Sequence, residues 1–313
     1  MEKGTNIFFM GKGGVGKSTA AALNSFFLAQ KGYHVLVVSL DPAHNQSDIF
    51  EKNLSDKPLE IVPNLLGIEI DQDYWIKRYL KDVQDQINKT YSYLTALNLD
   101  KYFRVVKHSP GLEEYALILV FKDILQKYGD LDFLVFDMPP TALALKFFTL
   151  PTLSLIWIEQ LLVLRQEIIK KRDLITKVKY MKKEVEKDKI LNKINEMKRD
   201  YENLKNIFED CVRTHINLVL NPDKLSLAES QRIFSALEDI HIRCSRIMNN
   251  KMLPSSSCDD INKAFAGTPI CECPYSETPL IGINNLEEFL KVNADTVAEH
   301  VNHLLPTGIE MSK

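Results

Sequence analysis

The chain has 313 residues, of which 45% are hydrophobic and 26% charged, an ordinary composition for a globular protein. This composition excludes collagen-like, low-complexity and wholly disordered chains. The net charge of -3 gives no chain-wide field that would attract nucleic acid or an anionic membrane, so we expect no nucleic-acid partner. The five cysteines are an odd number without regular spacing, which favours a reducing compartment over a secreted disulfide scaffold.

Targeting and membrane-spanning patterns are not evident in the sequence. The apolar run 7–10 is short and is followed directly by glycines, whereas the apolar core of a signal peptide is longer. The longest apolar stretch, 147–164, is interrupted by polar residues and a proline, so the sequence predicts no bilayer span. We therefore expect a cytoplasmic protein.

Short apolar runs alternate with helical patterns along the chain. The run 5–10 leads into a glycine-rich loop, and the segment 17–31 has helical character and ends before Gly32. Continuous apolar strands separated by helices predict an α/β fold with a doubly wound, mostly parallel sheet. Further buried strands are predicted at 34–40, 132–136, 215–220 and, more weakly, 242–248.

The character of the chain changes between residues 147 and 210. Residues 167–206 include many charged side chains, and most of these are basic. Apolar residues recur there at three- and four-residue steps. This pattern predicts an amphipathic helix or helical hairpin, with the charges on a solvated face. We expect a helical subdomain, 147–210, inserted into an α/β domain made of 1–146 and 211–313. The stretch 286–305 predicts a C-terminal packing helix.

The apolar stretch 147–164 has two interpretations. As a helix it would be apolar nearly all round, which fits burial in the core of the subdomain. It also fits one wall of a groove for a hydrophobic client helix. The sequence leaves both open.

Residues 11–19, GKGGVGKST, lie between the first predicted strand and the first predicted helix. Glycines at 13, 14 and 16 allow the backbone to curl so that consecutive amides point at an anion. The helix that starts at Lys17 directs the positive end of its dipole to the same point. Lys17 suits the β- and γ-phosphates of a nucleotide, and the Ser18 hydroxyl suits Mg²⁺. The segment therefore predicts a phosphate loop.

Lys12 is a second lysine, which an ordinary phosphate loop does not need. Such a lysine is typical of dimeric ATPases in which it crosses to the phosphates of the partner subunit and stabilises transition-state charge. The alternative is a surface charge without a role. We expect Lys12 to act catalytically.

Two carboxylates follow predicted strands. Asp41 follows 34–40 and Asp137 follows 132–136, so both are expected at the sheet edge that carries the phosphate loop. Asp41 is expected to orient or deprotonate the attacking water, and it also suits an Asx turn before Pro42. Asp137 is expected to bond the Mg²⁺ shell through water.

Six segments in order resemble the family of arsenite-pump ATPases and tail-anchored-protein targeting ATPases. The resemblance spans most of the chain and weakens between residues 167 and 206. The motif DPAHN distinguishes this family from related ATPase classes with the same loop. The segments are GKGGVGKST (11–19), DPAHNQSD (41–48), SPGLEE (109–114), DMPPTA (137–142), LNPDKLSLAESQR (220–232) and PLIGINNLEEF (279–289).

The resemblance implies a P-loop NTPase fold and a homodimeric ATPase that uses ATP and Mg²⁺. It implies that Asp41 activates water and that Lys12 reaches the partner's phosphates. It assigns Ser18 and Asp137 to the metal. Nucleotide contacts are implied for Gly11, Lys12, Gly13, Gly14, Val15, Gly16, Lys17, Ser18 and Thr19.

The resemblance also covers the nucleotide base, and the chain departs from the family pattern elsewhere. Asn249 matches the position that reads adenine, and Pro274 matches the loop that closes over the base. After the threonine of DMPPT, the family usually continues with Gly and His, where this chain has Ala142 and Leu143. A histidine that would couple the nucleotide state to the helices is therefore missing.

The cysteines match neither branch of the family. The targeting branch usually carries a CxxC zinc pair at its dimer interface, whereas Cys258 stands alone and Cys271 and Cys273 form CxC. A CxC pair could supply half of a zinc site across a two-fold axis, but on an extended segment it is more often structural. The clustered cysteines and duplicated halves of the arsenite branch are not visible.

We expect an ATP-hydrolysing homodimer that couples ATP binding and hydrolysis to the handling of a hydrophobic or membrane-protein client. One alternative is the catalytic subunit of an arsenite or anion efflux pump. Another is a regulatory ATP-binding module with little turnover, which Ala142 and Leu143 suggest.

Overall fold

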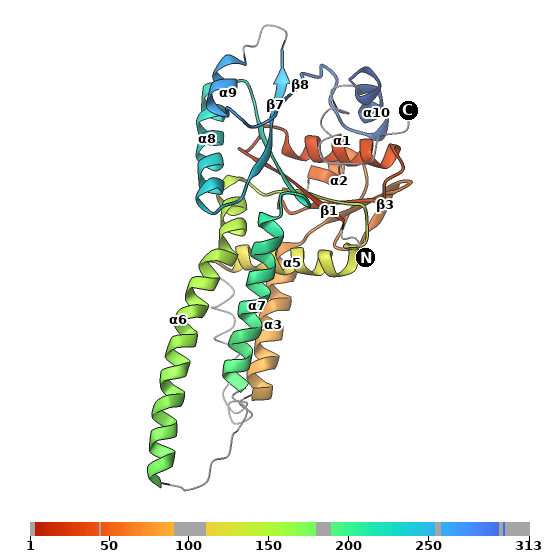
Figure 1. Ribbon diagram of the computed structural model, residues 1–313. Coiled ribbons are helices and arrows are strands. Elements are labelled where there is room, and N and C mark those ends of the chain that lie inside the picture. Colours follow the sequence, from red (N-terminus) through yellow and green to blue (C-terminus); the bar gives the residue numbers. More distant parts are fainter. Residues whose placement is uncertain are drawn as a thin grey trace. The chain divides into compact units, whose positions relative to one another are not determined.

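The computed structural model describes residues 4–43, 45–90, 111–179, 189–253, 258–293 and 297. Contacts divide the chain into two compact units, one formed by residues 1–147 and 211–313 and the other by residues 148–210. Figure 1 labels most of the helices and strands, which are numbered in chain order.

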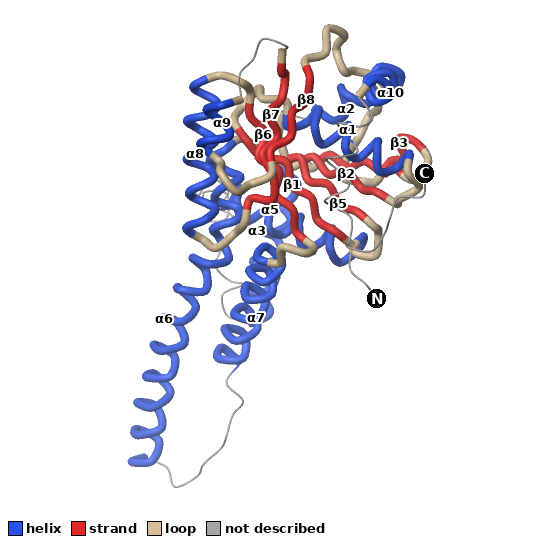
Figure 2. Tube along the Cα trace, turned by 45° about the horizontal axis from the view of Figure 1, so that its top comes forward, coloured by secondary structure: helices blue, strands red, loops and turns tan. Residues whose placement is uncertain are grey.

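The larger unit is built on one eight-stranded sheet with the order β3-β4-β2-β5-β1-β6-β7-β8. Neighbouring strands are parallel except β3 and β4, so the prediction of a mostly parallel sheet is confirmed. Figure 2 shows the strands as one layer with helices on both sides. The strands are β1 (Thr5–Gly11), β2 (Val35–Ser39), β3 (Leu59–Val62), β4 (Leu65–Glu69), β5 (Phe133–Asp137), β6 (Thr214–Leu220), β7 (Cys244–Met252) and β8 (Ile270–Pro274).

The five predicted strands correspond to β1, β2, β5, β6 and β7. Their residues are mostly buried, which explains the continuous apolar runs in the sequence. The prediction missed β3, β4 and β8. β3 is a short and partly exposed edge strand, Gly67 lies inside β4, and Glu272 lies between the two cysteines of β8, so none has a strong strand pattern.

The helices of the larger unit connect these strands. The predicted helix 17–31 is α1, which starts directly after the glycine-rich loop. The predicted C-terminal helix begins as α10, and apart from Val297 its residues beyond 293 lie outside the described residues. The helices are α1 (Lys17–Gln30), α2 (Asn45–Phe50), α3 (Gln72–Thr90), α5 (Leu112–Tyr128), α8 (Lys224–Asp239), α9 (Asp259–Ala264) and α10 (Ile283–Val292).

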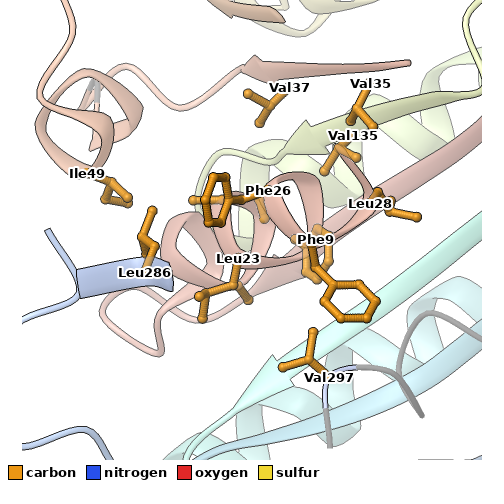
Figure 3. Packing of buried hydrophobic residues seen from close by; sticks show 14 of the residues in the cluster. Phe9, Leu23, Phe26, Leu28, Val35, Val37, Ile49, Val135, Leu286 and Val297 are labelled. Atoms are coloured by element: carbon orange, nitrogen blue, oxygen red, sulfur yellow. The ribbon is translucent and has the colours of Figure 1, made fainter. Parts of the chain in front are cut away.

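One face of the sheet packs against α1, and α10 packs against α1 in the same buried cluster. Phe9 of β1 and Val37 of β2 belong to the same buried cluster as Leu23 and Phe26 of α1, and Leu286 of α10 joins it (Figure 3). Burying each such side chain stabilises the fold by about 1.5–3 kcal/mol. α1 therefore has a fixed position on the sheet, and so does the loop that precedes it.

The other face of the sheet carries a group of aromatic rings. Phe8 of β1 stacks on Phe136 of β5 with ring centroids 4.8 Å apart. Phe121 of α5 meets Phe147 edge-on at 5.7 Å. Because both faces are covered, β1 and β5 are held from two sides, and the prediction of a doubly wound sheet is confirmed.

The smaller unit is helical. It contains most of α6 (Thr141–Lys179), which begins in the larger unit, and α7 (Lys189–Glu209). Within the unit, Phe148 of α6 packs edge-on against Phe208 of α7, with ring centroids 5.0 Å apart. The chain thus forms two helices here, and residues 180–188 between them lie outside the described residues.

The prediction that no stretch is long enough to span a bilayer is wrong. Thr141–Lys171 is a helical segment with a mean hydropathy of 1.7 in its most apolar window, which is long and apolar enough to cross a membrane. The polar residues and Pro151 interrupt the apolar run of the sequence, but the helix continues through them. One such helix is weak support for a membrane span, because core helices of soluble proteins meet the same criterion.

Burial in a core does not explain the apolar stretch 147–164. Only 22% of the apolar window of α6 is buried, and Trp157 is 72% exposed. Phe147, Phe148 and Ile158 are exceptions and are buried. The other interpretation of this stretch, one wall of a groove for a hydrophobic client helix, stays a prediction.

Candidate functional site

The predicted phosphate loop lies at the carboxyl end of β1, between Gly11 and the start of α1 at Lys17. Gly11 and Gly16 have φ angles of 152° and 95°. A β-carbon at Gly11 would collide with the carbonyl of Val219 on β6, and one at Gly16 would collide with the Asn250 amide. Glycine is therefore required at Gly11 because the backbone of β6 approaches so closely, and at Gly16 because of its left-handed φ angle and the nearby Asn250 side chain.

The structure changes the assignment of the loop glycines in one respect. Gly14 has a φ of 82°, in agreement with its predicted role in curling the backbone. Gly13 does not have a positive φ, and a β-carbon there would meet no atom within 4 Å. The sequence predicted that position 13 needs a glycine for its backbone conformation. The structure shows this need at Gly11 instead, because the backbone of β6 contacts Gly11.

Two side chains of β7 donate hydrogen bonds to the phosphate loop. Asn250 Nδ2 donates a hydrogen bond to the Val15 carbonyl at 2.8 Å, and Lys251 Nζ donates one to the Gly14 carbonyl at 3.0 Å. These bonds engage carbonyl groups of the loop and leave its amides available for an anion. The prediction missed both residues, although the polar run after Met248 at the end of a strand was a usable signal.

Lys17 is buried at the first position of α1, with 5% of its surface exposed. Its Nζ donates a hydrogen bond to the Lys12 carbonyl at 3.3 Å. The helix has no side-chain cap at Gly16 and no acidic residue in its first turn. Uncapped amides, a helix dipole and a buried ammonium group together form a site for an anion.

Asp137 lies at the carboxyl end of β5 and is completely buried. Its Oδ2 accepts a hydrogen bond from Gln46 Nε2 at 3.1 Å, while its Oδ1 has no hydrogen-bond partner. Gln46 also donates to the Ser18 carbonyl at 2.9 Å and so joins Asp137 to the start of α1. Sequence reasoning placed Ser18 and Asp137 here and missed Gln46.

Burial raises the pKa of Asp137 to about 6. Hydrogen bonding from Ser18 and Gln46 and the positive charge of Lys17 lower this pKa, and the charge of Asp41 raises it. A nearby cation would stabilise this carboxylate, because the carboxylate is buried and one of its oxygens has no hydrogen-bond partner.

Asp41 lies just beyond β2, with 7% of its surface exposed. Its Oδ1 accepts a hydrogen bond from the Ala43 amide at 3.0 Å, which is the Asx turn expected before Pro42. The Leu40 amide donates to the Asp137 carbonyl at 2.9 Å, so the two strand ends are joined. The structure thus brings Asp41, Asp137 and the phosphate loop to the same sheet edge.

Thr141, the first residue of α6, contacts the site directly. Its Oγ1 lies 2.8 Å from Glu229 Oε1 of α8 and 3.5 Å from the Gly11 carbonyl. The start of α6 is therefore joined to the phosphate loop through Thr141. Sequence reasoning pointed to the next two positions, Ala142 and Leu143, and missed this contact.

The residues predicted for the base lie at the same sheet edge. Asn249 on β7 is completely buried; its Nδ2 donates to Met252 Sδ at 2.8 Å, and its Oδ1 has no partner. An unpartnered carbonyl oxygen suits the amino group of adenine. Pro274 ends the neighbouring strand β8 and lines a cavity of about 290 Å³ together with residues of α10.

The cysteines of this region are held as neutral thiols. Burial raises the pKa of Cys271 to about 12 and that of Cys273 to about 11. Burial and the carboxylate of Glu272, which accepts a hydrogen bond from Cys258 Sγ at 2.7 Å, raise the pKa of Cys258 to about 11. Metal binding requires thiolates, so these surroundings favour a structural role for the CxC pair. Among the described residues, no three His, Cys, Asp or Glu side chains form a metal cluster.

Comparison with known proteins identifies the family. The sequence model of the family described as anion-transporting ATPase matches residues 5–294. The chain belongs to this family. Members of the anion-transporting ATPase family are ATPases, which explains why this chain has a phosphate loop. The chain is accordingly a nucleotide-binding ATPase.

Relatives within the anion-transporting ATPase family carry two kinds of name. The chain is 28% identical over 302 residues to "Putative arsenical pump-driving ATPase 2" of Aquifex aeolicus, covering 91% of this chain and 97% of that protein. It is 30% identical over 266 residues to ATPase GET3C of Arabidopsis thaliana, covering 80% and 67%. It is 28% identical over 260 residues to the ATPase ASNA1 homolog of Plasmodium berghei, covering 82% and 65%.

Proposed function

We propose that this ATPase is a cytoplasmic homodimer that hydrolyses Mg²⁺-bound ATP and uses the nucleotide cycle to handle a hydrophobic or membrane-protein client. One observation carries the catalytic part. The uncapped start of α1 with buried Lys17 suits phosphates, and beside it Asp137 offers a buried carboxylate oxygen without a partner. The helical unit 148–210 is the proposed client-handling part.

The residues at the sheet edge fit a Mg²⁺ ion. Asp137 Oδ1 is buried and unpartnered, and Ser18 lies close enough to lower the pKa of that carboxyl group. Carboxylate and hydroxyl oxygens are ligands that Mg²⁺ prefers. Ser18 and Asp137 would hold the ion, directly or through water, and Mg²⁺ neutralises charge on the β- and γ-phosphates when bound.

The chain's own residues position the reactants. Lys17 and the amides of the first turn of α1 bind the phosphates, and the base lies between Asn249 and the segment after Pro274. Asp41 has one oxygen fixed by the Ala43 amide, so its second oxygen is left to orient the attacking water and accept its proton. Lys12 reaches the phosphates of the partner subunit and stabilises charge in the transition state.

Replacing Asp41 with asparagine tests this assignment. The Asp41→Asn variant should bind ATP within about threefold of the wild type and lose turnover by at least about 100-fold, because an amide orients water but takes no proton. Nucleotide binding is measured by calorimetry and turnover by phosphate release. Asp239→Asn, an exposed change at the end of α8, is the matched control. Unchanged turnover in Asp41→Asn would remove Asp41 from the mechanism.

The client-handling part of the proposal rests on an exposed apolar stripe of α6. Its members recur at three- and four-residue steps and therefore share one face of the helix. Their exposed fractions run from 43% to 72%, which is unusual for large apolar side chains that recur along one helix face. The stripe consists of Leu153, Ile156, Trp157, Leu161, Leu164 and Ile168.

Thr141 gives the nucleotide site a direct connection to this helix. It is the first residue of α6, and its hydroxyl lies against both the Gly11 carbonyl and Glu229. A change in the loop on loss of the γ-phosphate therefore acts on the start of α6 without the family's usual histidine.

Charge on the stripe should prevent capture of a client. The amount of a co-expressed single-pass membrane segment that co-purifies with the double variant Trp157→Glu/Leu161→Glu should fall at least about tenfold. The reason is that docking would bury the new carboxylates against apolar groups, which is unfavourable. Capture is measured by co-purification with the full chain, and basal ATP turnover should not change. Leu225→Glu, at a site 73% exposed on α8, is the control. Equal capture by both variants would refute the role of the stripe.

A second candidate function is that of an arsenite-pump ATPase, which the name of the Aquifex relative favours. Stimulation of ATP turnover by arsenite, without any effect of the stripe variant on client capture, would support it. ATP binding by the wild type without measurable turnover would instead support a regulatory module.

A further inference from the structure

A second cavity lies toward the amino ends of β6 and β7, away from the phosphate loop. Gly11, at the end of β1 that carries the phosphate loop, pairs with Val219 of β6. His215, which lines the cavity, pairs with Ile7 nearer the other end of β1. Four residues of strand between His215 and Val219 correspond to about 13 Å. The cavity measures about 210 Å³ and is lined mainly by Cys211, His215, Asn217, Arg243, Ser245 and Arg246, all from the larger unit.

The lining of this cavity is basic. It contains two arginines and a histidine and no carboxylate. Arg246 is only 4% exposed, and a buried guanidinium group is costly unless negative charge or acceptors surround it. Arg246 and His215 have interactions of their own within the chain, and a guanidinium group with five donors can bind an anion in addition to them. Arg243 makes no ion pair within the part of the chain that the structure describes.

The neutral groups of the cavity are also donors. Asn217 is 2% exposed, and its Nδ2 is buried without a hydrogen-bond partner. Ser245 Oγ accepts a hydrogen bond from the Ile216 amide at 3.1 Å, so its own hydrogen is left to donate. A buried amide donor without an acceptor is destabilising, and a bound acceptor would remove this cost.

We propose that this cavity binds a small multivalent oxyanion of the phosphate class, separately from the nucleotide. Guanidinium groups, an amide and a hydroxyl match the several acceptor oxygens and the charge of such an ion. The volume lies below the range of 300–1,000 Å³ that is usual for drug-sized ligands, which excludes a whole nucleotide. The inference does not depend on the proposed client or on the roles of Asp41 and Lys12.

Protection of Cys211 from alkylation tests the site. Cys211 is exposed and lines the cavity, so a bound anion should shield its thiol. The full chain is saturated with Mg²⁺ and a non-hydrolysable ATP analogue, which occupies the phosphate loop, and is treated with iodoacetamide with or without inorganic phosphate. Peptide mass spectrometry should show alkylation of Cys211 slowed at least about fivefold by phosphate and not by chloride of equal ionic strength.

Variants of Arg243 separate a specific site from a general salt effect. Arg243 is exposed, so Arg243→Gln should fold normally; it should abolish the protection and weaken phosphate binding in calorimetry at least about tenfold. Arg243→Lys should retain part of both effects, and Arg232→Gln on α8 should retain all of them. The proposal is overturned if phosphate fails to protect Cys211 or protects it equally in Arg243→Gln.

Discussion

The Asp137→Asn variant is expected to be more stable than the wild type in the absence of nucleotide and to have lost ATP hydrolysis. Burial raises the pKa of Asp137 to about 6 from an ordinary value of 3.8. At pH 7 the folded protein therefore holds an unfavourable buried charge, which costs on the order of 3 kcal/mol. Asparagine removes this charge, and with it the anionic ligand proposed for Mg²⁺, so turnover should fall at least about 100-fold.

The pH dependence of the stability of Asp137→Asn is its internal control. Between pH 3.8 and about 6 the folded wild type binds more protons than the unfolded chain, so its stability falls as the pH rises through this range. The advantage of the variant in thermal unfolding should be largest at pH 7 and should shrink toward pH 4. Asp239→Asn should show no such trend. A variant that is less stable than the wild type at pH 7 would contradict the account of Asp137.

Replacing Lys12 is the second change with a large expected effect. Lys12 is half-buried on the loop, and its ammonium group has no hydrogen-bond or ion-pair partner among the residues that the structure describes. If the lysine acts on the partner's phosphates in the transition state, Lys12→Ala should lower turnover at least about 100-fold and ATP affinity by less than about threefold. Phosphate release and calorimetry measure the two quantities.

The control for this change is Lys52→Ala, an exposed lysine after α2 that should leave both quantities unchanged. Lys12→Arg should restore part of the turnover, since the charge is kept. A Lys12→Ala protein with wild-type turnover, or an active monomer, would rule out action on a partner subunit.

The sequence was most informative where the chemistry of the site is local. The glycines, Lys17 and Ser18 lie within one short segment between a buried strand and a helix, so motif and context agree. Asp41 and Asp137 could be placed because each follows a strand, and the carboxyl ends of parallel strands share one edge. The fold class followed from the same continuous apolar strands.

Sequence reasoning failed where the decisive contact is distant along the chain. Asn250 and Lys251 contact the phosphate loop only because β6 lies between β1 and β7 in the sheet, an order that no local pattern specifies. The demand for glycine at Gly11 likewise comes from the backbone of β6. Exposure of the α6 stripe was not predictable, since an apolar helix is more often buried.

Mixing two inactive variants is the most direct test of a phosphate loop that works between two copies. In a mixed dimer of Lys12→Ala and Asp41→Asn, the site with intact Asp41 receives the intact Lys12 of the partner. Re-associated equal mixtures should therefore recover about a quarter of wild-type turnover, since half of the dimers are mixed and each has one complete site. A mixture that remains as inactive as its components, although mixed dimers have formed, would contradict the shared site.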